Sequence, residues 1–111
     1  MIEEIVRDYL EQMLDMGVYL EVVPQGSPPF IVLEKTGSFD ENFITRATIA
    51  VQSYGSSLYE AAQLNVEVIE AMKQIITLDE ISCCDLNSDY NFTDTESKRY
   101  RYQAVFDITH Y

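Results

Sequence analysis

Residues that could perform chemistry are few in this chain and widely spaced. His110 is the only histidine among 111 residues, which disfavours catalytic triads, histidine acid-base pairs and imidazole-rich metal sites. Cys83 and Cys84 are the only cysteines, and their adjacency lacks the two-residue spacing of zinc sites. Neighbouring residues of a strand point to opposite faces, which also disfavours a disulfide between them. We therefore expect two reduced thiols, one buried and one partly exposed, and no metal or cofactor.

Two further patterns could hold a ligand but have simpler interpretations. The turn from Gly55 to Ser57 opens a helix N-terminus, where free amides can bind an anion. It lacks the lysine and the glycine spacing of a phosphate loop, and Ser57 with Glu60 forms a capping box, which favours simple capping. The carboxylates between Asp85 and Glu96 do not have the alternating ligands and central glycine of an EF-hand. A solvated acidic loop is the better interpretation.

Charge and composition exclude several classes of function. The formal charge is -12, from 19 acidic and 7 basic residues, which disfavours nucleic-acid binding because phosphate contacts need clustered Lys and Arg. The first residues are acidic and amphipathic, so we expect no signal peptide. No apolar stretch approaches the roughly 20 residues that a membrane helix needs. We expect a protein made and used in the cytoplasm.

The elements that must position these residues follow from the hydrophobic pattern. Apolar residues at helical spacing predict one helix from Ile2 to Met16, with Gly17 as its left-handed stop, and a second from Leu58 to Ile76. Alternating patterns predict five strands. They are Val18 to Val22, Phe30 to Lys35, a third that begins near Phe43 or Ile44 and ends before Gly55, Ile81 to Leu86, and the stretch that ends near His110.

The final strand is the longest of the five. It has about twelve residues where five or six are usual, so we expect it to pair antiparallel with the fourth strand and to leave part of its backbone unpaired. Together the pattern predicts one α+β domain over residues 1–111. Two helices pack on one mainly antiparallel five-stranded sheet.

Two polar segments are candidate interaction surfaces. Thr36 to Asn42 is predicted to be a polar loop, and Asn87 to Ser97 a longer loop or irregular strand. The basic charge gathers on the third and last strands, which suggests either a row of ion pairs within the sheet or a patch that binds an acidic copy of the same protein. Phe39 is either an exposed contact or a lid on the core. The candidate interface residues are Phe39, Asp40, Glu41, Asp89, Tyr90, Phe92, Asp94, Arg99 and Arg101.

Three stretches carry a family resemblance. They are PPFIVLEKTG (Pro28 to Gly37), ATIAVQSYGSSLYEAAQLNVEVIEAM (Ala47 to Met72) and RYRYQAVFDITHY (Arg99 to Tyr111). With the order of elements, they make the chain resemble the tail terminator, or tail completion, proteins of long-tailed bacteriophages and prophages. This group includes proteins once described as minor capsid proteins. The resemblance spans nearly the whole chain and includes no catalytic motif.

The resemblance implies a structural virion-assembly protein and not an enzyme. Such a subunit forms a homo-oligomeric ring, usually a hexamer, that caps the tail tube, ends its polymerisation and offers a docking face for head-tail joining. The implied partners are further copies of the chain, the major tail tube protein and the head-completion connector. DNA passes through the ring without specific binding, and a negative lumen would keep it mobile. The implied location is the host cytoplasm and then the virion tail.

A second hypothesis comes from the charge alone. An acidic protein can be a DNA mimic whose carboxylates imitate phosphates and occupy a DNA-binding enzyme. The acidic residues are scattered through both predicted helices and several loops, without a dense periodic row, and solubility alone could explain them. The ring protein is therefore the preferred hypothesis, followed by the DNA mimic and then a small enzyme.

Overall fold

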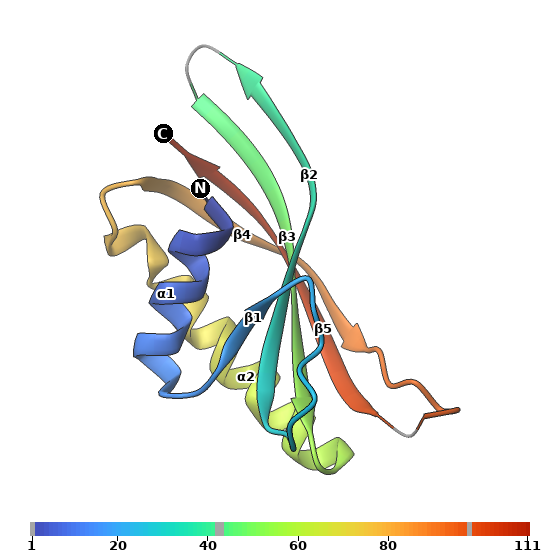
Figure 1. Cartoon of the computed structure of the whole chain (residues 1–111). Helices are drawn as coiled ribbons and strands as arrows, with labels where there is room; N and C mark the ends of the chain where they lie inside the picture. The colour runs from blue at the N-terminus through green and yellow to red at the C-terminus, as the bar shows by residue number, and fades with distance from the viewer. Residues whose placement is uncertain (1, 42–43, 98) are drawn as a thin grey trace.

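The chain forms a single α+β domain in which two helices lie on one side of a strongly twisted five-stranded sheet (Figure 1). This arrangement is seen in a computed structural model, which describes residues 2–41, 44–97 and 99–111; the side chains of Phe39 and Glu41 lie outside the described part. The predicted fold class is confirmed. Neither helix of the described chain is long and apolar enough to cross a membrane.

Both helices lie where their apolar stripes predict them, and both end earlier than expected. Helix α1 is Ile2–Leu14 and helix α2 is Leu58–Lys73, followed by a short 3-10 turn, η1, at Ile75–Thr77. Gly17 is not the left-handed stop of α1. That conformation belongs to Asp15, whose φ is 53°, because a short polar side chain tolerates it better than most others.

The five strands form one sheet in the order β1-β2-β3-β5-β4. Strand β1 pairs with β2 in parallel, and every other neighbouring pair is antiparallel. The strands are β1 Val18–Leu20, β2 Phe30–Glu41, β3 Ile44–Gly55, β4 Ile81–Asn91 and β5 Tyr100–His110.

Two polar segments are partly strand: the loop prediction for Thr36 to Asn42 was wrong, whereas the alternative of an irregular strand for Asn87 to Ser97 is confirmed as far as Asn91. Strand β2 continues from Thr36 to Glu41 along β3, after a register shift between Lys35 and Gly37, and the hairpin projects past the helices in Figure 1. Residue 42 of that predicted loop lies outside the described residues. Strand β4 likewise continues to Asn91, and only the part after it is loop. Both extensions are polar because little of the core lies beneath them.

The prediction that the last strand overhangs its neighbour was also wrong. Strand β5 lies between β3 and β4, and it pairs with β3 from Tyr100 to His110 and with β4 from Tyr102 to His110. The edges of the sheet are β4 on one side and, on the other, β1 together with the part of β2 that β1 leaves uncovered, since β1 pairs only with Ile31 to Leu33. Strands β2 and β4 each carry a register shift, a common protection against edge-to-edge pairing.

The turn between β3 and α2 confirms the predicted cap and explains its glycine. The Ser57 hydroxyl accepts a hydrogen bond from the Glu60 amide at 3.1 Å, and the Glu60 carboxylate accepts one from the Ser56 amide at 2.8 Å. A Cβ on Gly55 would come within 2.5 Å of the Ala61 backbone nitrogen. Glycine is therefore needed here because the strand passes so close to the first turn of the helix.

The core lies between the helices and the face of the sheet that they cover. Alternate residues of β3 and β5 point into it, which is the pattern expected of a sheet covered on one side. The Tyr9 hydroxyl joins the two helices by donating to the Ala71 carbonyl at 2.6 Å. The main buried side chains are Val6, Leu10, Ile31, Leu33, Ile49, Val51, Leu64, Val68, Met72, Ile75, Ala104, Phe106 and Ile108.

Two valines of α2 give a matched test of this packing. Val68 is fully buried and Val66 is 54% exposed. Val68→Asp places an unpaired charge in the core, at a cost of about 3 to 5 kcal/mol, much of the roughly 5 to 15 kcal/mol that holds such a domain. Val66→Asp should change the free energy of unfolding by about 0.5 kcal/mol or less. Urea unfolding of both variants measures the difference, and equal stabilities would place α2 outside the core.

Candidate functional site

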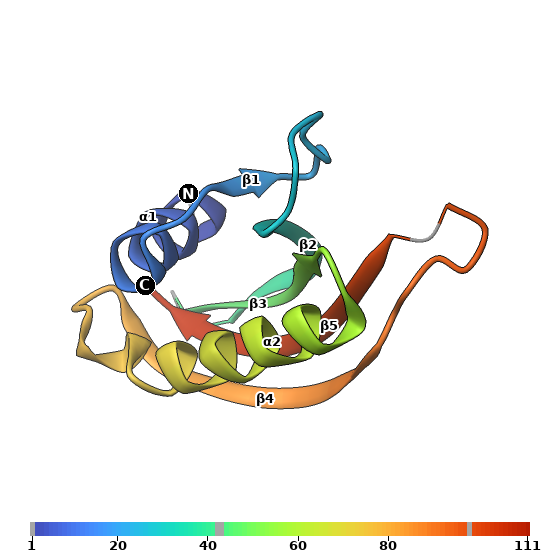
Figure 2. The same cartoon turned by 90° about the horizontal axis from the view of Figure 1, so that it is seen from below.

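The residues predicted to form an interface lie at two ends of the molecule. Asp40 pairs with Thr45 at one end of β3, and Arg101 pairs with Tyr54 at the other. At about 3.3 Å per residue, these positions are about 30 Å apart along the strand. Figure 2 shows the connection between β4 and β5 extending away from the helices at the second end. The structure therefore divides the predicted residues into two groups.

The first group is at the tip of the β2–β3 hairpin. Asp40 is exposed there, and its carboxylate accepts a hydrogen bond from the Thr45 hydroxyl at 2.6 Å. The side chains of Phe39 and Glu41 lie outside the described part of the chain, so the two interpretations of Phe39 remain open. The hydrogen bond between Asp40 and Thr45 links β2 to β3 near the end of the hairpin.

The second group centres on Arg101, which packs within its own chain. Its Nε donates to the Phe92 carbonyl at 2.7 Å and its Nη1 donates to the Tyr54 hydroxyl at 2.8 Å. The guanidinium also lies 4.5 Å from the centre of the Phe92 ring and 5.7 Å from that of Tyr54. Such a cation over an aromatic face is attracted by the ring quadrupole. Arg101 therefore stabilises the hairpin, a role that neither sequence hypothesis included.

A polar chain continues from Arg101 across three strands. The Tyr54 hydroxyl donates to the side-chain oxygen of Gln52 at 3.3 Å, and the side-chain amide of Gln52 donates to the side-chain oxygen of Gln103 at 2.9 Å. The side-chain amide of Gln103 in turn donates to the Tyr90 hydroxyl at 2.5 Å. Both glutamines are buried on the sheet face opposite the helices, so these bonds satisfy groups that would otherwise be costly to bury. Sequence reasoning missed this pair because only the β3–β5 register brings it together.

The remaining predicted residues near this end have different roles. Asp94 orders the turn, since its carboxylate accepts from the Glu96 amide at 3.0 Å and from the Ser97 hydroxyl at 2.8 Å. The Ser97 hydrogen bond, followed by the amide bonds, lowers the pKa of Asp94. Asp89 is exposed and pairs with Ala104, which puts it on the helix side of the sheet. Arg99 is exposed at the start of β5.

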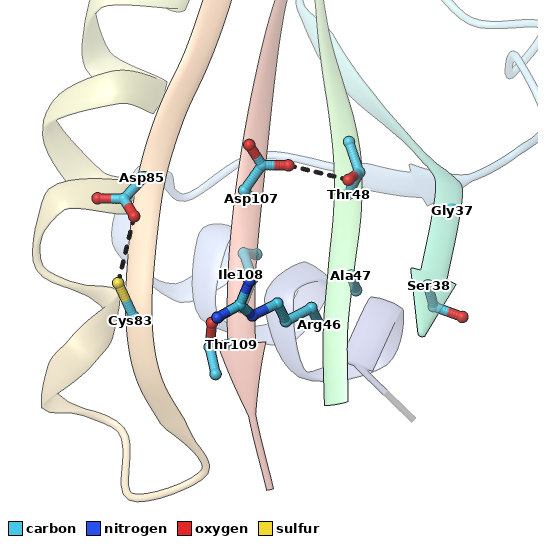
Figure 3. A pocket seen from close by; sticks show the side chains of 10 residues that line it. All are labelled: Gly37, Ser38, Arg46, Ala47, Thr48, Cys83, Asp85, Asp107, Ile108 and Thr109. Atoms are coloured by element: carbon cyan, nitrogen blue, oxygen red, sulfur yellow. Dashed lines mark hydrogen bonds between the residues drawn. The ribbon is translucent and has the colours of Figure 1, made fainter. Parts of the chain in front are cut away.

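A hollow of about 530 Å³ lies on the sheet face opposite the helices, toward the tip of the β2–β3 hairpin (Figure 3). Asp107 lies in the middle of a polar row, where it accepts from the Thr48 hydroxyl at 2.9 Å and from the Asn87 amide at 2.9 Å. Asp85 accepts from the Cys83 thiol at 3.3 Å. The lining residues are Gly37, Ser38, Arg46, Ala47, Thr48, Cys83, Asp85, Asp107, Ile108 and Thr109.

A smaller hollow of about 280 Å³ lies at the opposite end of the same strands. Phe30 and Tyr54 form one wall, with their rings stacked at 4.8 Å, and Arg99 lies at this hollow. Its other lining residues are Gly26, Pro28, Gly55, Ser56 and Tyr100. This hollow is mainly aromatic and backbone-lined, whereas the larger one is polar.

The two cysteines are free, as predicted, and both are poor nucleophiles. Cys84 is partly buried, and this burial, reinforced by Asp85, Cys83 and Asp107, raises the pKa of its thiol to about 12. The hydrogen bond to Asp85 is the main cause that raises the pKa of the exposed Cys83. Both thiols are protonated at neutral pH, a state that disfavours nucleophilic chemistry.

Comparison with known proteins adds no family to this description. No protein-family model matches the sequence, and no curated protein matches it at a significant level. Within residues 2–41, 44–97 and 99–111, no three His, Cys, Asp or Glu side chains gather so that they could hold a metal ion.

Arg99 and Arg101 provide a matched pair that separates a packed arginine from an exposed one. Arg101→Glu removes two hydrogen bonds and two ring contacts and brings a carboxylate against the Phe92 carbonyl. We expect a loss of about 2 to 4 kcal/mol in the free energy of unfolding. Arg99→Glu should change the free energy of unfolding by about 0.5 kcal/mol or less. Chemical unfolding of both variants tests this, and a stable Arg101→Glu protein would contradict the structural role.

Cys84 should make the fold sensitive to alkaline pH. The folded protein keeps the Cys84 proton up to about pH 12, whereas the unfolded chain loses it near the ordinary thiol value of 9.0. The folded state therefore binds more protons between these values, and the free energy of unfolding should fall as pH rises through that window. The free energy of unfolding of Cys84→Ala should fall less steeply with pH than that of the wild type. Cys83→Ala is the comparison variant and should change the pH dependence less than Cys84→Ala does, because that thiol is exposed.

Proposed function

We propose that this chain is a phage or prophage tail terminator subunit. In this proposal it forms a ring, usually a hexamer in the family, that caps the tail tube and offers a docking face to the head-completion connector. It acts during assembly in the host cytoplasm and then remains in the virion tail. Its partners are further copies of itself, the major tail tube protein and the connector. It has no catalytic role and needs no cofactor.

The fold supports this proposal because it agrees with what the family resemblance implies. The resemblance implies an α+β subunit, and the chain folds as one, with two helices on a five-stranded sheet. The stretches that carry the resemblance correspond to β2, to β3 with α2, and to β5. These segments make the centre of the sheet and its largest helix.

The observation that carries the proposal is the unlike chemistry of the two ends. The chain extends 44 Å along its longest axis. The β2–β3 hairpin, with the polar hollow beside it, is at one end, and the β4–β5 turn with Arg99 is at the other (Figure 1). A patch that meets a different patch on the next copy generates a closed ring or an open helix, whereas a self-complementary patch stops at a dimer. An elongated subunit with unlike ends is therefore suited to forming a closed ring or an open helix.

The distribution of acidic residues supports a ring more than a DNA mimic. Acidic side chains occupy the first turns of both helices and also occur on β2, β4 and the β4–β5 turn. They lie on both sides of the sheet, as Asp85 and Asp89 show, so they do not form one continuous row like a phosphate backbone. In a ring, the same charge would repel DNA and keep it mobile in the lumen.

Assembly with a tail tube tests the proposed function. The tube protein encoded beside this chain would be polymerised in vitro with and without the purified chain, and tube lengths measured by negative-stain electron microscopy. We expect shorter tubes with a ring on one end, at about one ring per tube. Arg99→Glu tests the importance of the β4–β5 end because Arg99 is exposed, and Val66→Asp serves as the folded control.

Unchanged tube lengths and bare tube ends would contradict the proposal. A pull-down from infected cells distinguishes the rival hypothesis. Capture of tail tube proteins supports the terminator, and stoichiometric capture of a nuclease or polymerase supports the DNA mimic.

A further inference from the structure

The polar hollow contains two carboxylates on neighbouring strands, and each is turned toward a different hydrogen-bond partner (Figure 3). Asp85 of β4 and Asp107 of β5 are direct register partners, and both line the hollow. Like charges at directly opposed positions of a sheet destabilise it, so this arrangement is unfavourable for the isolated fold. We call Asp85 and Asp107 the carboxylate pair.

The described hydrogen bonds to the carboxylate pair come from neutral groups. Asp107 accepts from the neutral Thr48 hydroxyl and the neutral Asn87 amide, and Asp85 accepts from the Cys83 thiol. Arg46 is the one cation among the lining residues, so two carboxylates against one guanidinium leave the hollow negative. Burial is the main cause that raises the pKa of the Cys84 thiol, and the charges of Asp85 and Asp107 raise it further.

Most basic side chains of the described residues already have a contact within the chain. Arg46 already lies in the hollow, and Arg101 is held by Tyr54 and Phe92. The remaining pairs are Arg7 with Asp8 and Glu11, Lys35 with Glu3, and Lys73 with Glu70. Arg99 is the basic side chain that is exposed and forms no ion pair with any described residue.

Arg99 cannot reach the carboxylate pair of its own chain. It precedes β5, and Asp107 lies near the other end of that strand. At about 3.3 Å per residue the separation is about 25 Å, far beyond the length of one side chain. The two features could therefore meet only between two copies of the chain.

We propose that the carboxylate pair receives the Arg99 guanidinium of a second copy of the chain, which joins subunits head to tail. This inference rests on the proposed ring and names the contact that forms it. A guanidinium suits the site because its planar fork can donate to two carboxylates at once. Each copy offers Arg99 at one end and the carboxylate pair at the other, so the contact repeats from subunit to subunit. It also offsets part of the repulsion between subunits of charge -12.

A charge swap within one chain tests the contact. The variants are Asp85→Lys, Arg99→Glu and the double variant, studied by sedimentation velocity and by electron microscopy of rings on tail tubes. Each single variant should weaken self-association about tenfold or more. The double variant should recover most of it, because Glu at 99 then meets Lys at 85. Asp107 is left unchanged because its hydrogen bonds to Thr48 and Asn87 hold the strands.

Asp89→Lys is the matched control. It makes the same charge change on the same strand at an exposed position, but on the helix side of the sheet, so it should assemble like the wild type. Thermal melting confirms that every variant is folded.

Three results would overturn the contact. If either single variant forms rings and caps tubes like the wild type, the contact is wrong and tail termination stands. If the folded double variant remains as defective as the single variants, Arg99 and Asp85 do not meet. If the wild-type chain forms no ring on tubes or at high concentration, the contact and the proposed function both fail.

Discussion

The pairing of β5 between β3 and β4 is the constraint on which both faces of this molecule depend. Its alternate residues place Ala104, Phe106 and Ile108 in the core and leave Gln103 and Asp107 on the opposite face. A slip of one residue would exchange these sets and put an amide and a carboxylate against the helices. Burial of the apolar set therefore also fixes the positions of the polar set. The polar hollow and the glutamine pair are consequences of the same register that makes the core.

Hydrophobic periodicity was sufficient to predict the fold wherever one face of an element is buried. The helix stripes and the alternation in β3 and β5 predicted the α+β class. It was insufficient in the outer parts of β2 and β4, where the described side chains are mostly exposed, because backbone pairing holds those strands and leaves no side-chain pattern. The predicted antiparallel pairing of the last strand with the fourth is confirmed, but the predicted overhang failed for a related reason. A local pattern does not state that β5 has two neighbours, so the predicted overhang was an inference from length alone.

The candidate site was less predictable than the fold because its parts meet through non-local pairing. The sequence predicted that Arg101 belongs either to a row of ion pairs within the sheet or to a binding patch, and only the approach of Tyr54 and Phe92 gives it its structural role. Asp85 and Asp107 looked like two of many carboxylates until the β4–β5 register placed them opposite each other. A signal was nevertheless present in the sequence. Polar residues recur at alternate positions of β5, on the face that the helices do not need.

The same strand also relates the two ends that assembly would use. Arg99 stands just before β5 and Asp107 near its end, so a continuous strand, paired on both sides, sets the distance between them. A strand buried in the middle of a sheet is among the least deformable parts of a domain, whereas turns and termini open easily. In the proposed ring, the spacing from one subunit contact to the next would therefore be set by rigid backbone. The curvature would depend on the sheet twist between these two positions, and a change in loop length would alter it little.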